Sequence, residues 1–108
     1  MASTFTHSSN VPLGTSRTLI YGPVISGTTV IVFSGTFANN DTSNKAQHTV
    51  TVERSDGSNY FPILVQVPVP WGGSLKSPKL VLGVGESLYG TADTASMIVA
   101  NLEMLINS

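Results

Sequence analysis

One stretch, residues 46–67 (AQHTVTVERSDGSNYFPILVQV), most constrains what this chain can fold into. Val50 and Val52 alternate with polar residues, and a period of two places successive side chains on opposite faces of a β-strand. Gly57 follows within a cluster of turn-forming residues, where it can adopt a positive φ at no steric cost. The stretch therefore predicts a β-hairpin, with a return strand at residues 60–65 that is apolar enough to be buried on both faces.

The rest of the chain reads as further short strands separated by Gly, Pro or Asn. We expect them within residues 15–21, 28–37, 74–75, 79–82, 87–91 and 96–106. The last segment is ambiguous, because Met97, Ala100 and Met104 also have a helical spacing, but its strict alternation favours a strand over a helix. About eight short strands at a spacing of roughly ten residues predict an all-β fold, an antiparallel β-sandwich of jelly-roll or immunoglobulin-like type.

The segment at residues 28–37 predicts two faces of one strand. Val30 and Val32 are expected on one face, with Ile31, Phe33 and Phe37 on the other. A glycine inside this strand favours a β-bulge.

Two prolines interrupt the segment that follows the hairpin. Pro68 and Pro70 cannot donate a hydrogen bond to a neighbouring strand. Residues 67–70 are therefore expected to leave the sheet or to lie on its edge.

The first residues differ from the rest, because they are polar and show little periodicity. We interpret residues 1–14 as an extended N-terminal arm and residues 15–108 as the β-sandwich domain. Phe5, Val11 and Leu13 are apolar residues in this polar arm and are candidate interface residues; docking on a neighbour and disorder both remain open. The interpretation predicts that a chain lacking the arm still folds.

Charged residues are scarce, at 10% of the chain against about 25% in ordinary soluble domains. A poorly charged surface rich in Ser and Thr fits faces covered by neighbouring proteins, although an extracellular-type β-domain with a neutral surface is the alternative. The net charge of −1 and scattered basic residues argue against nucleic acid as a partner. The lack of cysteine excludes disulfides and Cys-based zinc sites, and the short apolar runs and absence of a signal peptide argue against a membrane.

The sequence shows no catalytic constellation, so we expect no enzyme, no catalytic or metal-binding residues and no cofactor. His7 and His48 lie far apart without a carboxylate at a ligand-like offset, and both are read as structural or exposed. Residues 39–41 (Asn-Asn-Asp) could hold calcium through oxygen ligands, but turn capping explains them better.

Trp71 is the remaining candidate, and it allows two interpretations. With Tyr60, Phe61 and Tyr89 it could form a sugar-stacking platform, as in carbohydrate-binding modules. A single Trp in a Pro-Gly loop more often caps the end of a core, and we also count Trp71 as a possible interface residue. A small-molecule ligand is considered unlikely to be the partner.

Residues 67–92 carry a family resemblance. The run VPVPWGGSL, followed after a short gap by KLVLGVGESLYGTA, resembles small virion structural proteins of tailed bacteriophages. Upstream, the strand ending in Ala38-Asn39-Asn40 and the run Thr49–Val52 fit the same pattern, so the resemblance covers about residues 15 to 106. Trp71 departs from the small residue expected at its position.

The resemblance implies a small β-sandwich that serves as a building block of a phage particle, in head decoration, neck or collar, or tail surface. It implies a non-enzymatic protein, made in the host cytoplasm and located in the virion, with copies of itself and other virion proteins as partners. The alternative is a carbohydrate-binding β-sandwich module.

Overall fold

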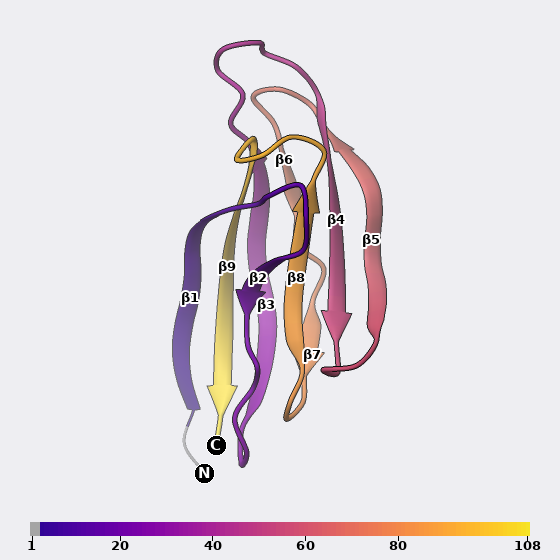
Figure 1. Cartoon of the computed structure of the whole chain (residues 1–108). Coiled ribbons are helices and arrows are strands. Elements are labelled where there is room, and N and C mark those ends of the chain that lie inside the picture. The colour runs from indigo at the N-terminus through magenta and orange to yellow at the C-terminus, as the bar shows by residue number, and fades with distance from the viewer. Residues whose placement is uncertain (1–2) are drawn as a thin grey trace.

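The computed structural model describes residues 3–108, and these form nine β-strands and no helix (Figure 1). The strands are β1 (Ser3–Pro12), β2 (Thr18–Tyr21), β3 (Thr29–Asn39), β4 (His48–Ser55), β5 (Tyr60–Val69), β6 (Ser74–Lys76), β7 (Leu80–Leu82), β8 (Ser87–Ala92) and β9 (Ile98–Asn107). The all-β class is thus confirmed, with nine strands where about eight were predicted. Within the described residues, no helix is long and apolar enough to cross a membrane.

Two antiparallel sheets form the sandwich. The five-stranded sheet has the order β1-β9-β3-β6, and β7 also pairs with β3, further along the same edge as β6. The four-stranded sheet has the order β2-β8-β4-β5. In Figure 1, β1 and β5 lie on opposite sides of the molecule.

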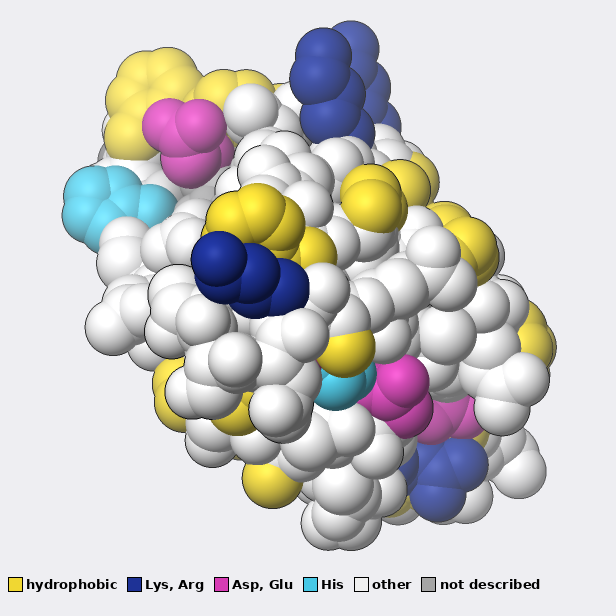
Figure 2. Space-filling model, turned by 90° about the horizontal axis from the view of Figure 1, so that it is seen from above, with side chains coloured by type: hydrophobic (Ala, Val, Ile, Leu, Met, Phe, Trp, Pro, Cys, Tyr) yellow, Lys and Arg dark blue, Asp and Glu magenta, His cyan; other side chains and the backbone are white. Residues whose placement is uncertain are grey.

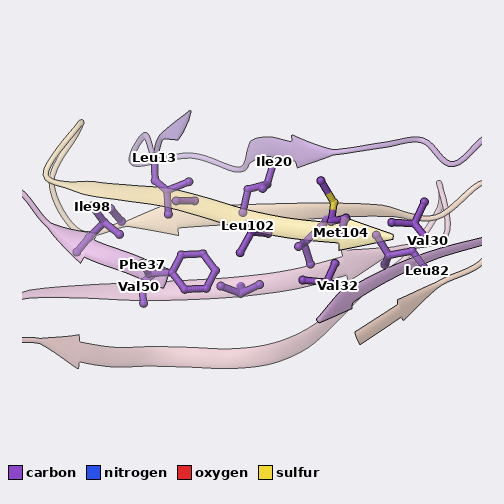
Figure 3. Packing of buried hydrophobic residues seen from close by; sticks show 14 of the residues in the cluster. Leu13, Ile20, Val30, Val32, Phe37, Val50, Leu82, Ile98, Leu102 and Met104 are labelled. Carbon is purple, nitrogen blue, oxygen red and sulfur yellow. The ribbon is translucent and has the colours of Figure 1, made fainter. Parts of the chain in front are cut away.

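The core fills the space between the sheets. Figure 3 shows Phe37, Leu102 and Met104 directed into this space, and all three are essentially fully buried. Gly90 of β8 makes room for Leu13, because a Cβ at position 90 would lie only 2.9 Å from both methyl carbons of that leucine. Burying a leucine side chain contributes about 1.5–3 kcal/mol, so Leu13 is a substantial part of this core.

A β-bulge in β3 corrects the predicted faces of that strand. The register against β9 shifts between Val32 and Ser34. The extra residue reverses the alternation, so Phe37 is buried on the same face as Val30 and Val32, and not opposite them as predicted. Gly35 lies beside the bulge with a φ of 144°, where an added Cβ would come within 2.5 Å of the carbonyl oxygen of Asn101.

The return strand of the central hairpin is not buried on both faces. The expectation of two buried faces for residues 60–65 is therefore wrong. β5 is the edge of the four-stranded sheet, and Val65 is 63% exposed. Within residues 60–65 only Ile63 and Leu64 are half-buried, and both pack against the core. Pro68 lies at an edge where a missing donor is tolerated, as predicted.

Two local predictions are confirmed. Gly57 has a φ of 102° in the turn between β4 and β5. The C-terminal segment is strand β9, and its residues Ile98, Ala100 and Leu102 face the core as the alternation indicates.

The segment interpreted as an arm is extended, but it is built into the sandwich. β1 pairs with β9 from Ser3 to Pro12, and the hydroxyl of Ser8 donates to the carbonyl oxygen of Ile20 in the other sheet at 2.8 Å. Leu13 is fully buried, so residues 3–13 share the sheet and the core of the rest of the chain. Residues 1–2 of the predicted arm lie outside the described residues, and a role for the segment towards another subunit stays a prediction.

Candidate functional site: the outer face of the five-stranded sheet

An apolar row crosses the solvent side of the five-stranded sheet. Its members are cross-strand neighbours, and in order across the sheet they are Phe5 (β1), Leu105 (β9), Ile31 (β3) and Val81 (β7). The two central members are half-buried, whereas Phe5 is 75% exposed and Val81 55% exposed at the two ends. This apolar row belongs to the outer face, because the residues that alternate with it along the two central strands, β3 and β9, face the core.

The bulge in β3 widens the apolar row near β1. Phe33 sits at the bulge and contacts Phe5 edge to face, with ring centroids 5.9 Å apart. Such pairs contribute about 0.5–1.5 kcal/mol beyond their burial, so Phe5 is held in a defined position although most of its surface is exposed.

A groove of about 630 Å³, lined by both polar and apolar groups, lies next to the apolar row on the same face. Its lining residues are His7, Ser9, Phe33, Ser34, Gly35, Thr36, Lys76, Ser77, Lys79, Asn101, Leu102 and Glu103. Half of these residues offer hydroxyl, amide or backbone groups, and Lys76, Lys79 and Glu103 carry charge. The groove is therefore suited to hydrogen bonding with another polar surface.

His48 is the centre of a hydrogen-bond network that the sequence did not reveal, in which His48 and Asp41 are buried and Asp93 is exposed. Its Nε2 lies 2.7 Å from a carboxylate oxygen of Asp41, and its Nδ1 lies 2.7 Å from one of Asp93. The hydrogen bond to Asp41, and after it the one to Asp93, raise the pKa of His48 above its ordinary value, although burial opposes this. The hydrogen bond to His48, and after it that from the backbone N–H of Asn44, lower the pKa of Asp41.

The network joins two loops of the sandwich to the start of β4 rather than forming a reaction centre. Asp41 lies in the loop before β4, His48 is the first residue of β4, and Asp93 follows β8. Both ring nitrogens of His48 are engaged, so neither is available to a substrate or metal. The structural reading of His48 agrees with this network. The sequence pattern did not identify its two carboxylate partners, because Asp93 is 45 residues away and Asp41 is reached through a loop.

Residues 39–41 serve as a cap, which was the favoured interpretation. The side-chain oxygen of Asn39 accepts from the N–H of Asp41, and Asp41 in turn accepts from the N–H of Asn44. In residues 3–108, no group of three or more His, Asp or Glu side chains is placed to hold a metal ion.

The four predicted interface residues do not form one surface. Phe5 lies in the apolar row and Trp71 follows the end of β5 in the other sheet. Val11 is half-buried against the core. Leu13 is fully buried, so it presents no surface to a neighbour, and its inclusion among them is corrected.

The aromatic residues proposed for sugar stacking are not brought together. Tyr60 and Phe61 begin β5 and Trp71 follows its end, which separates them by about 3.3 Å per residue along the strand. Tyr89 packs against Tyr60 at a centroid distance of 5.6 Å, away from Trp71. Trp71 is 46% exposed, and the ammonium of Lys45 lies 5.3 Å from its ring centroid.

Comparisons with known proteins identify only distant structural similarity. No family model matches the sequence, and no curated protein matches it. Two similar solved structures are crystal structures of a pentameric capsid protein isolated from metagenomic phage sequences, with TM-scores of 0.42 and 0.41 and identities of 17% and 15%. The matches cover 94% of this chain but only 59% and 63% of those chains, so this chain spans about three fifths of their length. At these TM-scores the similarity carries no inference about function.

Proposed function

We propose that this chain is a non-enzymatic structural component of a bacteriophage particle. It assembles with copies of itself and with other virion proteins through its sheet edges, its loops and the segment 1–14. The observation that carries this proposal is the outer face of the five-stranded sheet, where an exposed apolar row reaches an edge strand without charged residues.

The chemistry of the surface supports assembly. Exposed apolar groups that are contiguous and bordered by polar residues are typical of protein interfaces. Figure 2 shows an end of the molecule where most of the surface is neutral, with only a few separate charged side chains. On a symmetric lattice, many weak contacts of this kind sum to firm attachment.

The phage assignment draws on the sequence resemblance. The resembling segment, residues 67–92, contributes the end of β5 and strands β6, β7 and β8. We place the protein in the virion after synthesis in the host cytoplasm, in head decoration, neck or collar, or tail surface.

The histidine network favours a structural over a catalytic role. A general base must present a free nitrogen to its substrate. His48, the most buried histidine, instead bridges Asp41 and Asp93 and ties the loops together.

An inventory of purified particles tests the proposal. Mass spectrometry of particles purified by density gradient is expected to detect this chain at a copy number comparable with other structural proteins, and washing with high salt is expected to leave it attached. Its recovery only in the soluble fraction of the lysate would contradict the proposal.

Carbohydrate binding is the second candidate, favoured by the exposed ring of Trp71. We expect it to fail, because Lys45 occupies the neighbourhood of that ring and the other aromatic residues lie elsewhere. Titration with oligosaccharides, followed by Trp71 fluorescence and compared with Trp71→Phe, distinguishes the two. A saturable fluorescence change in a protein absent from particles would favour the carbohydrate-binding module.

A further inference from the structure

The four sheet edges of this chain are protected to very different degrees. β2 has four residues and an irregular register, and β6 and β7 have three residues each. β5 is long, but it contains Pro62 and Pro68, and its register against β4 shifts twice. Short strands, prolines and bulges are the features by which proteins block edge-to-edge pairing.

β1 has none of these protections along its first six residues. It runs from Ser3 to Ser8 in regular register against β9, without a proline, lysine, arginine or acidic residue. Its first irregularity comes after Ser8, where Asn10 has a φ of 56°. Residues 3–8 are therefore an open edge to which a further strand can add.

The hydrogen bonds around β9 show which backbone groups of β1 face outwards. The N–H of Leu13 donates to the carbonyl oxygen of Ile98, on the β1 side, and the N–H of Asn40 donates to that of Met97, on the β3 side. Backbone groups alternate in direction along an antiparallel strand, so the even-numbered residues of β9 bond to β1. Phe5 is paired with the odd-numbered Leu105, so its own N–H and C=O point away from β9, towards the free edge.

The apolar row ends at the same position. Phe5 is its last member and is 75% exposed, and within residues 3–108 no strand lies beyond it. A strand added to β1 would cover the free side of this ring and satisfy the outward backbone groups at the same residue.

We propose that the occupant of this edge is β1 of a second copy, paired antiparallel about a two-fold axis with Phe5 opposite Phe5 of the partner subunit. In this register Thr4 lies opposite Thr6 of the partner subunit, and Ser3 opposite His7 of the partner subunit. The pairing joins the two five-stranded sheets and the two apolar rows into one. The biological setting of this pairing rests on the proposed function. The pairing adds to that function the edge that is used between copies.

Three features favour a second copy in this register. The edge carries no formal charge at neutral pH, so two identical edges do not repel one another. Ser3, Phe5 and His7 share the outward direction of their backbone groups, and in this register each of them lies opposite a residue that is also one of these three. It also uses residues 3–7, which are five of the six residues in the straight part of the strand before the irregularity.

The absence of native cysteine allows a direct test of the register. Residues that exchange both backbone hydrogen bonds across an antiparallel pair have Cα atoms about 5.5 Å apart. That distance lies within the range of about 4.4–6.8 Å that a disulfide requires. Phe5→Cys is therefore expected to form a covalent dimer under mild oxidation.

Ser3→Cys is the matched control, two residues away on the same strand and face. In the proposed register it lies opposite His7 of the partner subunit, so it is expected to stay predominantly uncrosslinked. Equal crosslinking of both variants, or crosslinking of Ser3→Cys alone, would overturn the register.

Sedimentation equilibrium of the cysteine-free protein tests the pairing itself. The unmodified chain is expected to show a monomer–dimer equilibrium, and Phe5→Lys is expected to weaken it at least tenfold. Ile25→Lys is the control, since Ile25 is similarly exposed at 71% but lies in the loop between β2 and β3. A monomeric unmodified chain at millimolar concentration, or equal effects of the two lysines, would overturn the proposal.

The β1 pairing and the proposed virion role can be disproved independently of one another. A chain that is found in particles but forms no dimer through Phe5 retains the structural role and loses this pairing. A chain that dimerises through Phe5 but is absent from particles retains the pairing and loses the virion role.

Discussion

β1 and β5 are each ten residues long and each form the edge of a sheet, yet they are held and exposed in different ways. β5 is the more apolar strand, but its prolines and irregular register leave little regular edge for another strand. β1 is mostly polar, and its first six residues form a regular edge that ends the apolar row. Whether a further strand can pair with an edge therefore depends on a regular backbone and the lack of charge rather than on hydrophobicity.

The two strands also differ in what anchors them. β1 leads into Leu13, which is buried against Gly90. β5 ends beside His48, which pairs with Val69 and carries the carboxylate network. Substitutions at these anchors are expected to affect stability more than substitutions at the free edge of β5.

Deleting residues 1–14 is expected to unfold the chain or to leave it barely stable. The deletion removes β1 from β9 and leaves the cavity of Leu13, and loss of a buried leucine side chain alone costs about 2–5 kcal/mol. Urea denaturation followed by circular dichroism measures the change, with Leu13→Ala as an intermediate case. Near-normal stability, which the sequence led us to expect for an arm, would show that β1 is dispensable to the fold.

Val50→Asp is expected to destabilise the fold by about 3 kcal/mol or more, because it buries an unpaired charge on the core face of β4, the strand that holds β5. Thr51→Asp, on the outer face, is expected to cost less than about 1 kcal/mol. The hydroxyl oxygen of Thr51 accepts the N–H of Gln66, and a carboxylate can accept in its place. Similar losses for the two variants in chemical denaturation would mean that the faces of β4 are assigned wrongly.

The His48 network is expected to make stability depend on pH. The pKa of His48 is raised in the folded state, so its contribution is complete below the ordinary histidine pKa of about 6.5 and is lost as the pH rises through the raised value. The pKa of Asp41 is lowered, so its contribution is complete above the ordinary value of about 3.9 and is lost as the pH falls through the lowered value.

Thermal denaturation across this range is thus expected to show a plateau between about pH 4 and 6.5 and a decline above it. His48→Gln should abolish the alkaline decline, whereas His7→Gln should retain it. If the melting temperature of His48→Gln declined with rising pH as steeply as that of the unmodified chain, the His48 network would not be the cause of the decline.

The smallest effect on stability is expected at the edge of β5. Pro62→Thr combined with Pro68→Thr restores two backbone donors, and both positions lie in the edge strand, so we expect a change in stability of less than about 1 kcal/mol. The double variant should self-associate more strongly than the unmodified chain in analytical ultracentrifugation. Unchanged association would show that the irregular register, rather than proline, protects this edge.

Much of the fold could be predicted from local patterns. The alternation in residues 98–106 specifies a strand and its core face, because the period of side chains in a strand is two. The turn at Gly57 was predictable because few residues other than glycine accept its φ. The candidate site was harder to predict from the sequence, and of the four predicted interface residues only Phe5 lies in the apolar row.

The class of fold and the direction reversals follow from residues that are close neighbours in the chain, and the low charge of the surface follows from the composition. The tertiary structure alone decided that Phe37 turns inwards after the bulge, that Leu13 fills the space over Gly90, and that His48 meets Asp93. It also decided that Phe5 ends a row begun at Val81. Each of these depends on register or packing between segments far apart in the chain, which local periodicity does not encode.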